Sequence, residues 1–414
     1  MTARIKRSEC AYGWIPTLTL GMTMGRDTRT RIKYSQKTSK FMNISIMLKP
    51  ASSNCNLRCK YCFYNSLSSQ REMPSHGLMS EQTLRATLKK AFDFAGNDRV
   101  MLSFQGGEPL LAGKDFFRKL HEIIRQLNVN RAPVSIGVQT NGTLIDDEWC
   151  SIFKRGGYLV GLSLDGDELA DSLRVDANGN QTFPRVLESA KLMQKYGVNF
   201  NILTVLTKQV ANRIVPIYNF FKKQKFKHLQ FIPMLKPLRL DESGKPSCAK
   251  TYGEPFPSED ENYVMSGEDY YEFLQKCFSL YLKDCMDGKY TSVRQFDNFV
   301  RLAHFQNCEQ CGMEGHCCHQ FVIEGDGEVY PCDFYCLDCY DMGNINDTDF
   351  FALSKHPIAV EFIKESMVVE EKCKACKYFA MCKNGCKRER IDIDKCEAYK
   401  KFFAYALPHL QRIS

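Results

Sequence analysis

The chain has 414 residues, 44% of them hydrophobic, which is enough for roughly two domains with buried cores. Its net charge of +8 is mild, and no basic helix with interleaved aromatic residues occurs, so nucleic-acid binding is not expected. No run of about 20 apolar residues predicts a membrane span. Twenty cysteines are the unusual feature, and their clustering in a large chain indicates bound metal rather than disulfides.

The first 41 residues have the character of an extension rather than of a domain. Basic residues precede a weakly apolar run at 11–24, which Gly13 and Pro16 interrupt, and no small-residue cleavage site follows it. We therefore expect no secretory signal and predict a cytoplasmic protein. Residues 1–41 are expected to be disordered, or to result from an upstream start codon with Met42 as the true beginning.

From Met42 onward, predicted strands and helices alternate. Short apolar runs predict strands at 43–48, 99–104, 134–140, 159–164, 200–206 and 228–232. Apolar residues at helical spacing predict helices at 81–92, 115–127, 146–154, 183–196, 213–223 and 268–285. Six strand–helix units predict a parallel sheet with right-handed crossovers. Because a closed barrel of this kind needs eight units, we expect an open, partial (β/α)6 barrel.

The regular pattern fades in two places. Residues 233–266 are rich in Pro, Gly, Asp and Glu, and we expect a long loop or insertion there. Beyond about residue 306 most of the cysteines appear, and a segment with few core side chains can be held together by metal clusters. We therefore predict a barrel domain at 42–305 and a cysteine-rich domain at 306–414, which ends in a helix.

Cys55, Cys59 and Cys62 follow the first predicted strand. In a parallel barrel the loops after the strands form the active site. Three thiolates hold three irons of a four-iron cluster and leave the fourth iron open, as a catalytic metal centre requires. A zinc or ferredoxin-like site is the alternative, but a ferredoxin supplies a fourth nearby cysteine, and none lies between Cys62 and Cys150.

This Cys-x₃-Cys-x-Tyr-Cys motif after a first barrel strand resembles the radical S-adenosylmethionine (radical SAM) enzymes. The resemblance implies that S-adenosylmethionine chelates the open iron of a [4Fe–4S] cluster and is cleaved to a 5′-deoxyadenosyl radical. It also implies cofactor contacts by Gly106, Gly107 and Glu108 after the second strand, and by Ser163 and Arg174 at the fourth. On general grounds, paired glycines let backbone approach a ligand closely, and a carboxylate can accept a hydrogen bond from an ammonium group. A strand-end hydroxyl without a ligand is the alternative for Ser163.

The cysteine-rich region contains eight thiols at ordered spacings, enough for two fully ligated four-iron clusters; two zinc sites are the alternative. The array resembles the SPASM domain of radical enzymes that modify peptides and proteins. That resemblance implies two sets of ligands: Cys311, Cys317, Cys332 and Cys386 for one cluster, and Cys373, Cys376, Cys382 and Cys396 for the other. The expected cofactors are therefore three [4Fe–4S] clusters and S-adenosylmethionine.

Nine cysteines remain outside these motifs. Three of them fall in helical patterns and are expected in the core: Cys150, Cys277 and Cys285. Four others lie close in sequence to proposed ligands and compete with them for that role: Cys308, Cys318, Cys336 and Cys339. The last two are Cys10 and Cys248.

Wider stretches resemble the anaerobic sulfatase-maturating enzymes: 49–55, 61–64, 104–109, 139–144 and 330–335. That resemblance implies oxidation of a Cys or Ser in an apo-sulfatase to formylglycine, through removal of a hydrogen from the Cβ atom by the adenosyl radical. It implies Asp333, which follows Cys332, as the base that takes the thiol or hydroxyl proton. Burial and an adjacent anionic cluster should raise the pKa of Asp333. Tyr64 and Gln105 are implied to position the substrate peptide.

The expected partners are an apo-sulfatase polypeptide and a flavodoxin or ferredoxin that supplies electrons, since a mildly basic chain suits an acidic donor. Two other functions are compatible with the motifs. One is a peptide maturase of the same class, for example an enzyme that forms thioether crosslinks. The other is a non-catalytic iron–sulfur or zinc protein that serves electron transfer or scaffolding. The motifs leave open whether Cys or Ser is oxidised.

Overall fold

The computed structural model describes residues 42–238, 240–242, 244–246, 263–391 and 395–413. The expected extension at 1–41, residues 247–262 of the expected insertion, Cys10 and Cys248 lie outside these residues. Among the helices of the described part, none has the length and apolar character needed to span a membrane.

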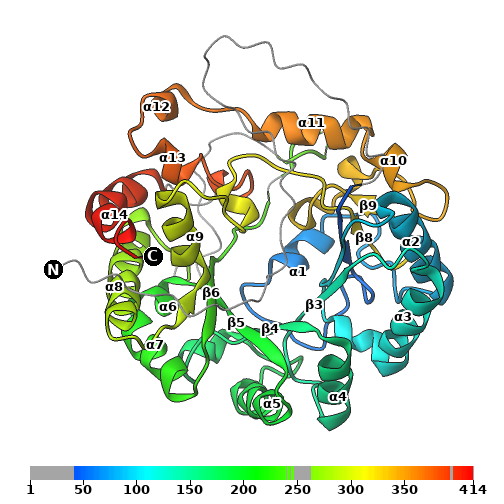
Figure 1. Ribbon diagram of the computed structural model, residues 1–414, viewed down its shortest axis with the longest axis horizontal. Coiled ribbons are helices and arrows are strands. Elements are labelled where there is room, and N and C mark those ends of the chain that lie inside the picture. Colours follow the sequence, from blue (N-terminus) through cyan, green and yellow to red (C-terminus); the bar gives the residue numbers. More distant parts are fainter. Residues whose placement is uncertain (1–41, 239, 243, 247–262, 392–394, 414) are drawn as a thin grey trace.

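Six parallel strands pair in sequence order and form the predicted partial barrel. Figure 1 shows the strands around a centre with helices outside them. The strands are β1 Ile44–Leu48, β2 Val100–Phe104, β3 Val134–Thr140, β4 Leu159–Ser163, β5 Asn199–Leu206 and β6 His228–Pro233. The helices that connect and follow them are α2 Glu81–Ala95, α3 Gly113–Leu127, α4 Asp147–Gly156, α5 Phe183–Tyr196, α6 Lys208–Asn212, α7 Ile214–Lys223 and α8 Gly267–Met286.

The predicted helix starts coincide with capping side chains. The Ser80 hydroxyl accepts a hydrogen bond from the Thr83 amide at the start of α2. Ser266 and Asp269 form a reciprocal capping box at the start of α8. Gly157 ends α4 in the left-handed conformation that glycine adopts without strain. Local sequence therefore fixes these helix ends, and the starts of α2 and α8 set where the preceding loops at the carboxyl edge of the sheet end.

Three short strands that the sequence does not predict extend the sheet at both edges. β7 Ser292–Val293 pairs with β6, and the hairpin of β8 Val322–Ile323 and β9 Val329–Tyr330 adds to β1. The Lys49 amide donates to the Ile323 carbonyl across this junction at 2.8 Å. The hairpin comes from beyond the domain boundary expected near residue 306, so one sheet runs through both expected domains.

The remaining helices pack the C-terminal part of the chain against the barrel. Three of them matter for the site: α1 Phe63–Ser68, α9 Arg294–Ala303 and α14 Lys395–Leu410. The others are α10 Phe350–Leu353, α11 Pro357–Ser366, α12 Glu371–Lys374 and α13 Phe379–Cys382. On α14 the Phe402 ring lies 5.5 Å from that of Phe278 on α8 and 5.6 Å from that of Phe299 on α9. Because these rings belong to one continuous core, the cysteine-rich part relies on side-chain packing to a greater extent than its sequence indicates.

Candidate active site

The first cysteine motif lies in the loop between β1 and α1, at the carboxyl ends of the parallel strands. Cys55, Cys59 and Cys62 are all half-buried free thiols, and Cys62 directly precedes the first residue of α1. Burial raises the pKa of Cys55 to about 11 and also raises the pKa of Cys59. The Leu57 amide points at the Cys55 sulfur from 3.4 Å. Buried thiols that resist ionisation suit a metal centre, because a bound cation compensates the charge that burial disfavours.

The two glycines after β2 bring two loops into backbone contact. The Gly107 amide donates to the Ser52 carbonyl at 2.9 Å. A Cβ atom at Gly106 would lie 2.5 Å from the Ser52 oxygen, and one at Gly107 would lie 2.0 Å from the Asn54 oxygen. Gly106 also has φ +118°, which side chains rarely adopt. These glycines therefore seat the loop that leads to Cys55, whereas the sequence reasoning expected them to give room to a ligand.

Glu108 has a different environment from the one expected. Its carboxylate is fully buried and accepts three hydrogen bonds from protein groups: the Leu110 amide at 3.0 Å, the Thr140 hydroxyl at 2.8 Å and the Asn141 amide at 2.7 Å. Burial outweighs these bonds and raises the pKa of Glu108 to about 7. The side chain thus ties the loop after β2 to the end of β3. The expected contact between this carboxylate and a ligand ammonium stays a prediction.

Arg174 is buried at the centre of a polar group beside the first cysteine loop. Its Nη1 donates to the Tyr61 hydroxyl at 3.0 Å, and Tyr61 donates to Asp165. Its Nε lies 3.8 Å from an oxygen of Asp171. Burial alone would lower the pKa of Arg174, but the surrounding anionic groups raise it well above its usual value, and its charge in turn lowers the pKa of Cys59. The structure therefore brings Arg174 to the cysteine motif.

Two further strand ends face the same site. Ser163, which ends β4, accepts a hydrogen bond from Gln139 on β3 at 2.9 Å. Asn141, which directly follows β3, lies with its side-chain nitrogen 3.8 Å from the Cys55 sulfur and 2.9 Å from the Asn56 side-chain oxygen. Asn141 is therefore a neighbour of the cysteine loop that the sequence motif alone did not identify.

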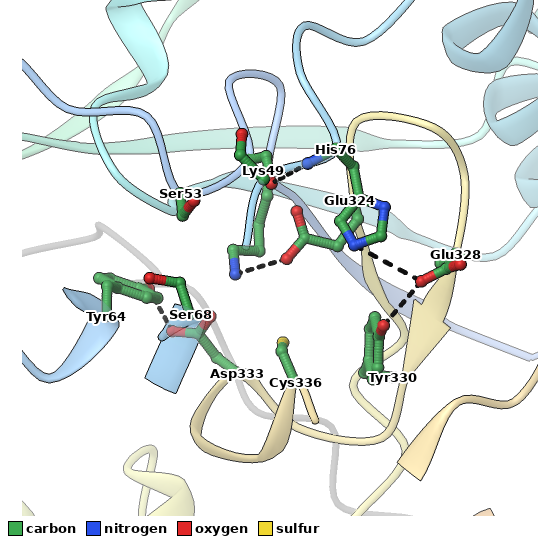
Figure 2. A network of polar contacts seen from close by, with 12 residues as sticks. Lys49, Ser53, Tyr64, Ser68, His76, Glu324, Glu328, Tyr330, Asp333 and Cys336 are labelled. Carbon is green, nitrogen blue, oxygen red and sulfur yellow. Dashed lines mark hydrogen bonds and ion pairs between the residues drawn. The ribbon is translucent and has the colours of Figure 1, made fainter. Parts of the chain in front are cut away.

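Asp333, Tyr64 and Gln105 come together from three separate segments (Figure 2 shows the first two). The Tyr64 hydroxyl donates to Oδ2 of Asp333 and lies 3.3 Å from the side-chain oxygen of Gln105. Oδ1 of Asp333 is buried and has no hydrogen-bond partner among the described residues. Burial raises the pKa of Asp333, although Lys49 and Tyr64 oppose the rise. Since buried polar atoms are nearly always paired, a free carboxylate oxygen here is ready to accept a proton from a substrate.

The charged residues around Asp333 were not predicted from the sequence. Lys49, Arg71 and Glu324 form a buried cluster next to it. The sole signal in the sequence is Lys49 at the end of an apolar strand, where a charged residue is unusual. Nothing in the sequence predicts that its partner lies 275 residues away.

The thiols of the C-terminal part gather in two sets of four. The Cys332 thiol is fully buried, and burial together with the nearby thiols Cys317, Cys386 and Cys311 raises its pKa well above its usual value. Burial raises the pKa of Cys382 as well, and there the neighbouring thiols are Cys373, Cys396 and Cys376. The structure thus brings Cys386 close to Cys332, and the two ligand sets expected from the family resemblance stay a prediction.

A cavity of about 340 Å³ lies within the second set of thiols. Its lining includes Cys373, Cys376, Cys382 and Cys396, and Cys386 reaches its wall. Four thiols around an internal space fit an iron–sulfur cluster, because thiolate ligands are the donors that such clusters require. The donor sets present therefore fit the three expected clusters.

The cysteines outside these sets have other surroundings. Three lie in the core as expected, with exposures of 5% or less: Cys150, Cys277 and Cys285. The Cys308 thiol donates to Glu314 at 2.9 Å. Cys336 is fully buried, beside Lys49 and Asp333. Cys318 hydrogen-bonds the proposed ligand Cys311 and so remains its neighbour and competitor.

This fold and these thiol groups define a radical SAM enzyme with an added cluster-binding domain. The family model of the radical SAM superfamily matches residues 50–221, and the model of the iron–sulfur cluster-binding SPASM domain matches residues 316–377. The Cysteine-type anaerobic sulfatase-maturating enzyme of Clostridium perfringens strain 13 is 41% identical over 380 residues, which cover 90% of this chain and 98% of the relative. The chain belongs to the family of anaerobic sulfatase-maturating enzymes.

Other relatives and solved structures agree with this membership. The Serine-type anaerobic sulfatase-maturating enzyme of Bacteroides thetaiotaomicron is 27% identical over 377 residues, covering 88% of this chain and 90% of that one. The structure of native anSMEcpe with bound AdoMet and Cp18Cys peptide matches with TM-score 0.80 and 39% identity, covering 89% of this chain and 98% of that one. SuiB of Streptococcus suis, at 18% identity and TM-score 0.56, covers 84% and 74% and shares the fold.

This membership decides between the functions that the motifs left open. The protein is a radical SAM oxidoreductase, so the non-catalytic alternative is wrong. Its cofactors are S-adenosylmethionine and three [4Fe–4S] clusters.

Proposed function

We propose that this enzyme oxidises a cysteine side chain of an apo-sulfatase polypeptide to Cα-formylglycine. The observation that carries the proposal is the buried Asp333 carboxylate, with one oxygen held by Tyr64 and the other free. The preference for cysteine is supported by the closer similarity to the Cysteine-type relative, at 41% identity, than to the Serine-type relative, at 27%.

Asp333 acts as the base in this reaction. When bound, the first cluster and S-adenosylmethionine supply the 5′-deoxyadenosyl radical that removes one hydrogen atom from the substrate Cβ. Oδ1 of Asp333 accepts the proton of the substrate thiol, while Tyr64 holds Oδ2 and Gln105 borders the same space. An auxiliary cluster, held by the thiols of the cysteine-rich region, would accept the second electron. The side chain would then become a thioaldehyde, which water hydrolyses to the aldehyde with release of hydrogen sulfide. The balance is a two-electron oxidation of the side chain.

We assign the remaining residues to cofactor binding. Cys55, Cys59 and Cys62 hold the first cluster, and the two sets of four thiols hold the auxiliary clusters. Arg174 and Ser163 bind S-adenosylmethionine, and so does the backbone at Gly106 and Gly107. The position of Arg174 beside Cys59 supports its part of this assignment, because the buried guanidinium is able to pair with a carboxylate.

We further propose that a small acidic electron donor of the flavodoxin or ferredoxin type reduces the first cluster, and that the enzyme works in the cytoplasm. The net charge of +8 supports an acidic donor, since opposite charges speed association. Low salt should therefore accelerate reduction by such a donor.

The test is anaerobic incubation of the cluster-reconstituted protein with S-adenosylmethionine, dithionite and a peptide containing Cys-x-Pro-x-Arg. We expect a mass loss that matches conversion of the thiol to the aldehyde, and slower conversion of the matched Ser peptide. Cleavage of S-adenosylmethionine without any aldehyde would contradict the proposal.

Replacement of the base gives a sharper prediction. Asp333→Asn keeps the size of the side chain but cannot take up a proton, so we expect formylglycine formation to fall by at least about 100-fold. S-adenosylmethionine cleavage should persist, because Asp333 plays no part in it. Asp347→Asn, an exposed residue of the same region, is the control. Full turnover by Asp333→Asn would refute the assignment.

A further inference from the structure

A buried charge cluster connects the barrel to the cysteine-rich region. The Lys49 ammonium donates to Oε1 of Glu324 at 2.8 Å, and the Arg71 guanidinium donates to the same oxygen at 2.7 Å. The three residues are 1%, 0% and 6% exposed, in the order Lys49, Glu324, Arg71. Burying three charges is costly, and a well-packed apolar cluster of the same size would be at least as stable. Such a cluster therefore calls for a role beyond holding the fold together.

The two cations of this cluster have different second contacts. The Lys49 ammonium lies 5.1 Å from the centre of the Tyr64 ring, within reach of a cation–π interaction, and its charge acts directly on Asp333. The Arg71 guanidinium lies 5.4 Å from the Tyr330 ring and contacts His76 instead. Figure 2 shows Lys49 between Glu324 on one side and Tyr64 with Asp333 on the other. Lys49 alone of the two cations reaches the pair that contains the base.

The contact between Lys49 and the Tyr64–Asp333 pair joins the barrel to the cysteine-rich region. Tyr64 belongs to α1 and follows the first cysteine motif, whereas Asp333 follows β9 in the cysteine-rich region. Lys49 directly follows β1 and Glu324 directly follows β8, and these two strands pair in parallel. The position of Tyr64 relative to Asp333 therefore depends on contacts across the β1–β8 pairing, and the Lys49–Glu324 ion pair lies at the end of that pairing.

We propose that Lys49, anchored by Glu324, is a positioning residue that holds the Tyr64 ring and the Asp333 carboxylate in the arrangement needed for proton removal. The inference rests on the proposed function, in which Asp333 is the base. In this role the Lys49 side chain does not contact the substrate. Its loss should misplace the base without harming the cluster that cleaves S-adenosylmethionine.

The test compares Lys49→Met with Arg71→Met. Each variant removes one buried cation from the same Glu324 oxygen and leaves the other cation to pair with it, so the two changes are matched for charge and burial. The quantity measured is formylglycine formed per 5′-deoxyadenosine released, with iron content and peptide-free S-adenosylmethionine cleavage as controls. Small misplacements of catalytic groups are costly, so we expect this ratio to fall about tenfold or more in Lys49→Met and to stay near wild type in Arg71→Met.

If the charge cluster had only a structural role, the ratio of formylglycine to 5′-deoxyadenosine would change equally in both variants. An unchanged ratio in Lys49→Met, or an equal loss in Arg71→Met, would overturn the inference. If Lys49→Met fails to retain iron, Lys49→Gln decides the question, because it keeps a hydrogen-bond donor for Glu324 but no charge for Tyr64, and the same loss of coupling is expected. A wild-type protein that forms no formylglycine would contradict the proposed function itself, which separates that failure from a failure of this inference.

Discussion

Gly107 shows how a single residue positions the first cysteine loop. A methyl group at this position would meet the backbone of Asn54, one residue before Cys55, and a backbone atom cannot move aside as a flexible side chain does. We expect Gly107→Ala to shift the cysteine loop, so that the protein loses the iron of one of its three clusters and with it S-adenosylmethionine cleavage. Iron analysis and 5′-deoxyadenosine formation check this.

Gly113→Ala is the matched control for Gly107→Ala. Gly113 has φ +85° but nothing within 4 Å of its Cβ position, so alanine there adds backbone strain without a clash. It should lower stability slightly and leave the iron content unchanged. Equal iron loss in both variants would contradict the role assigned to Gly107.

At the same scale, sequence motifs named residues whose contacts only the structure shows. Asp333, Tyr64 and Gln105 were named from motifs and lie together in the structure. Glu108 was also named, yet its carboxylate is enclosed by the ends of two strands. A motif records which residue type is required at a position, but the contact that requires it depends on neighbours that are distant in the sequence. Lys49 escaped notice for that reason.

Among the elements, helix α14 connects the packing of the core to the second set of thiols. It carries Cys396 near its first turn and the fully buried Phe402 two turns later. Phe402→Ala should cost about 3–5 kcal/mol, because it opens a cavity among the rings of α8 and α9. We expect a lower denaturation midpoint and partial loss of iron, measured by chemical unfolding and metal analysis.

The neighbouring surface residue provides the comparison for Phe402. Lys401→Ala removes an exposed ion pair with Glu268, which contributes little to stability because solvent screens the two charges. It should leave both the unfolding midpoint and the iron content close to wild type. A Phe402→Ala protein with full iron content would show that α14 does not depend on this packing to present Cys396.

Long helices and strands were easier to predict from the sequence than short strands. The six barrel strands and their helices have enough residues for an apolar period to appear, and all six strands occur where the sequence predicts them. The strands β7, β8 and β9 have two residues each, which is too short for any period. They form because their backbone N–H and C=O groups pair with those at the edges of the sheet.

For the whole molecule, the continuous sheet and core predict cooperative unfolding. The hairpin that pairs with β1 and the α14 rings that pack on α8 leave no interface at which the cysteine-rich part can separate freely. We expect loss of helical circular dichroism and loss of cluster absorbance to coincide in one denaturant transition under anaerobic conditions. Two separate transitions would instead support independently folding domains with a boundary near residue 306.

The sequence by itself determined the class of chemistry and the alternating barrel, because metal ligands and secondary-structure periods are written in local spacing. Three closely spaced cysteines after a strand indicate an open metal cluster, and eight more further on indicate further metal sites, which the family resemblance identifies as two closed clusters. Only the tertiary structure decided which groups surround Asp333. The Lys49–Glu324 pair joins residues 275 positions apart, and it exists because β1 pairs with β8 at an edge that no local pattern predicts.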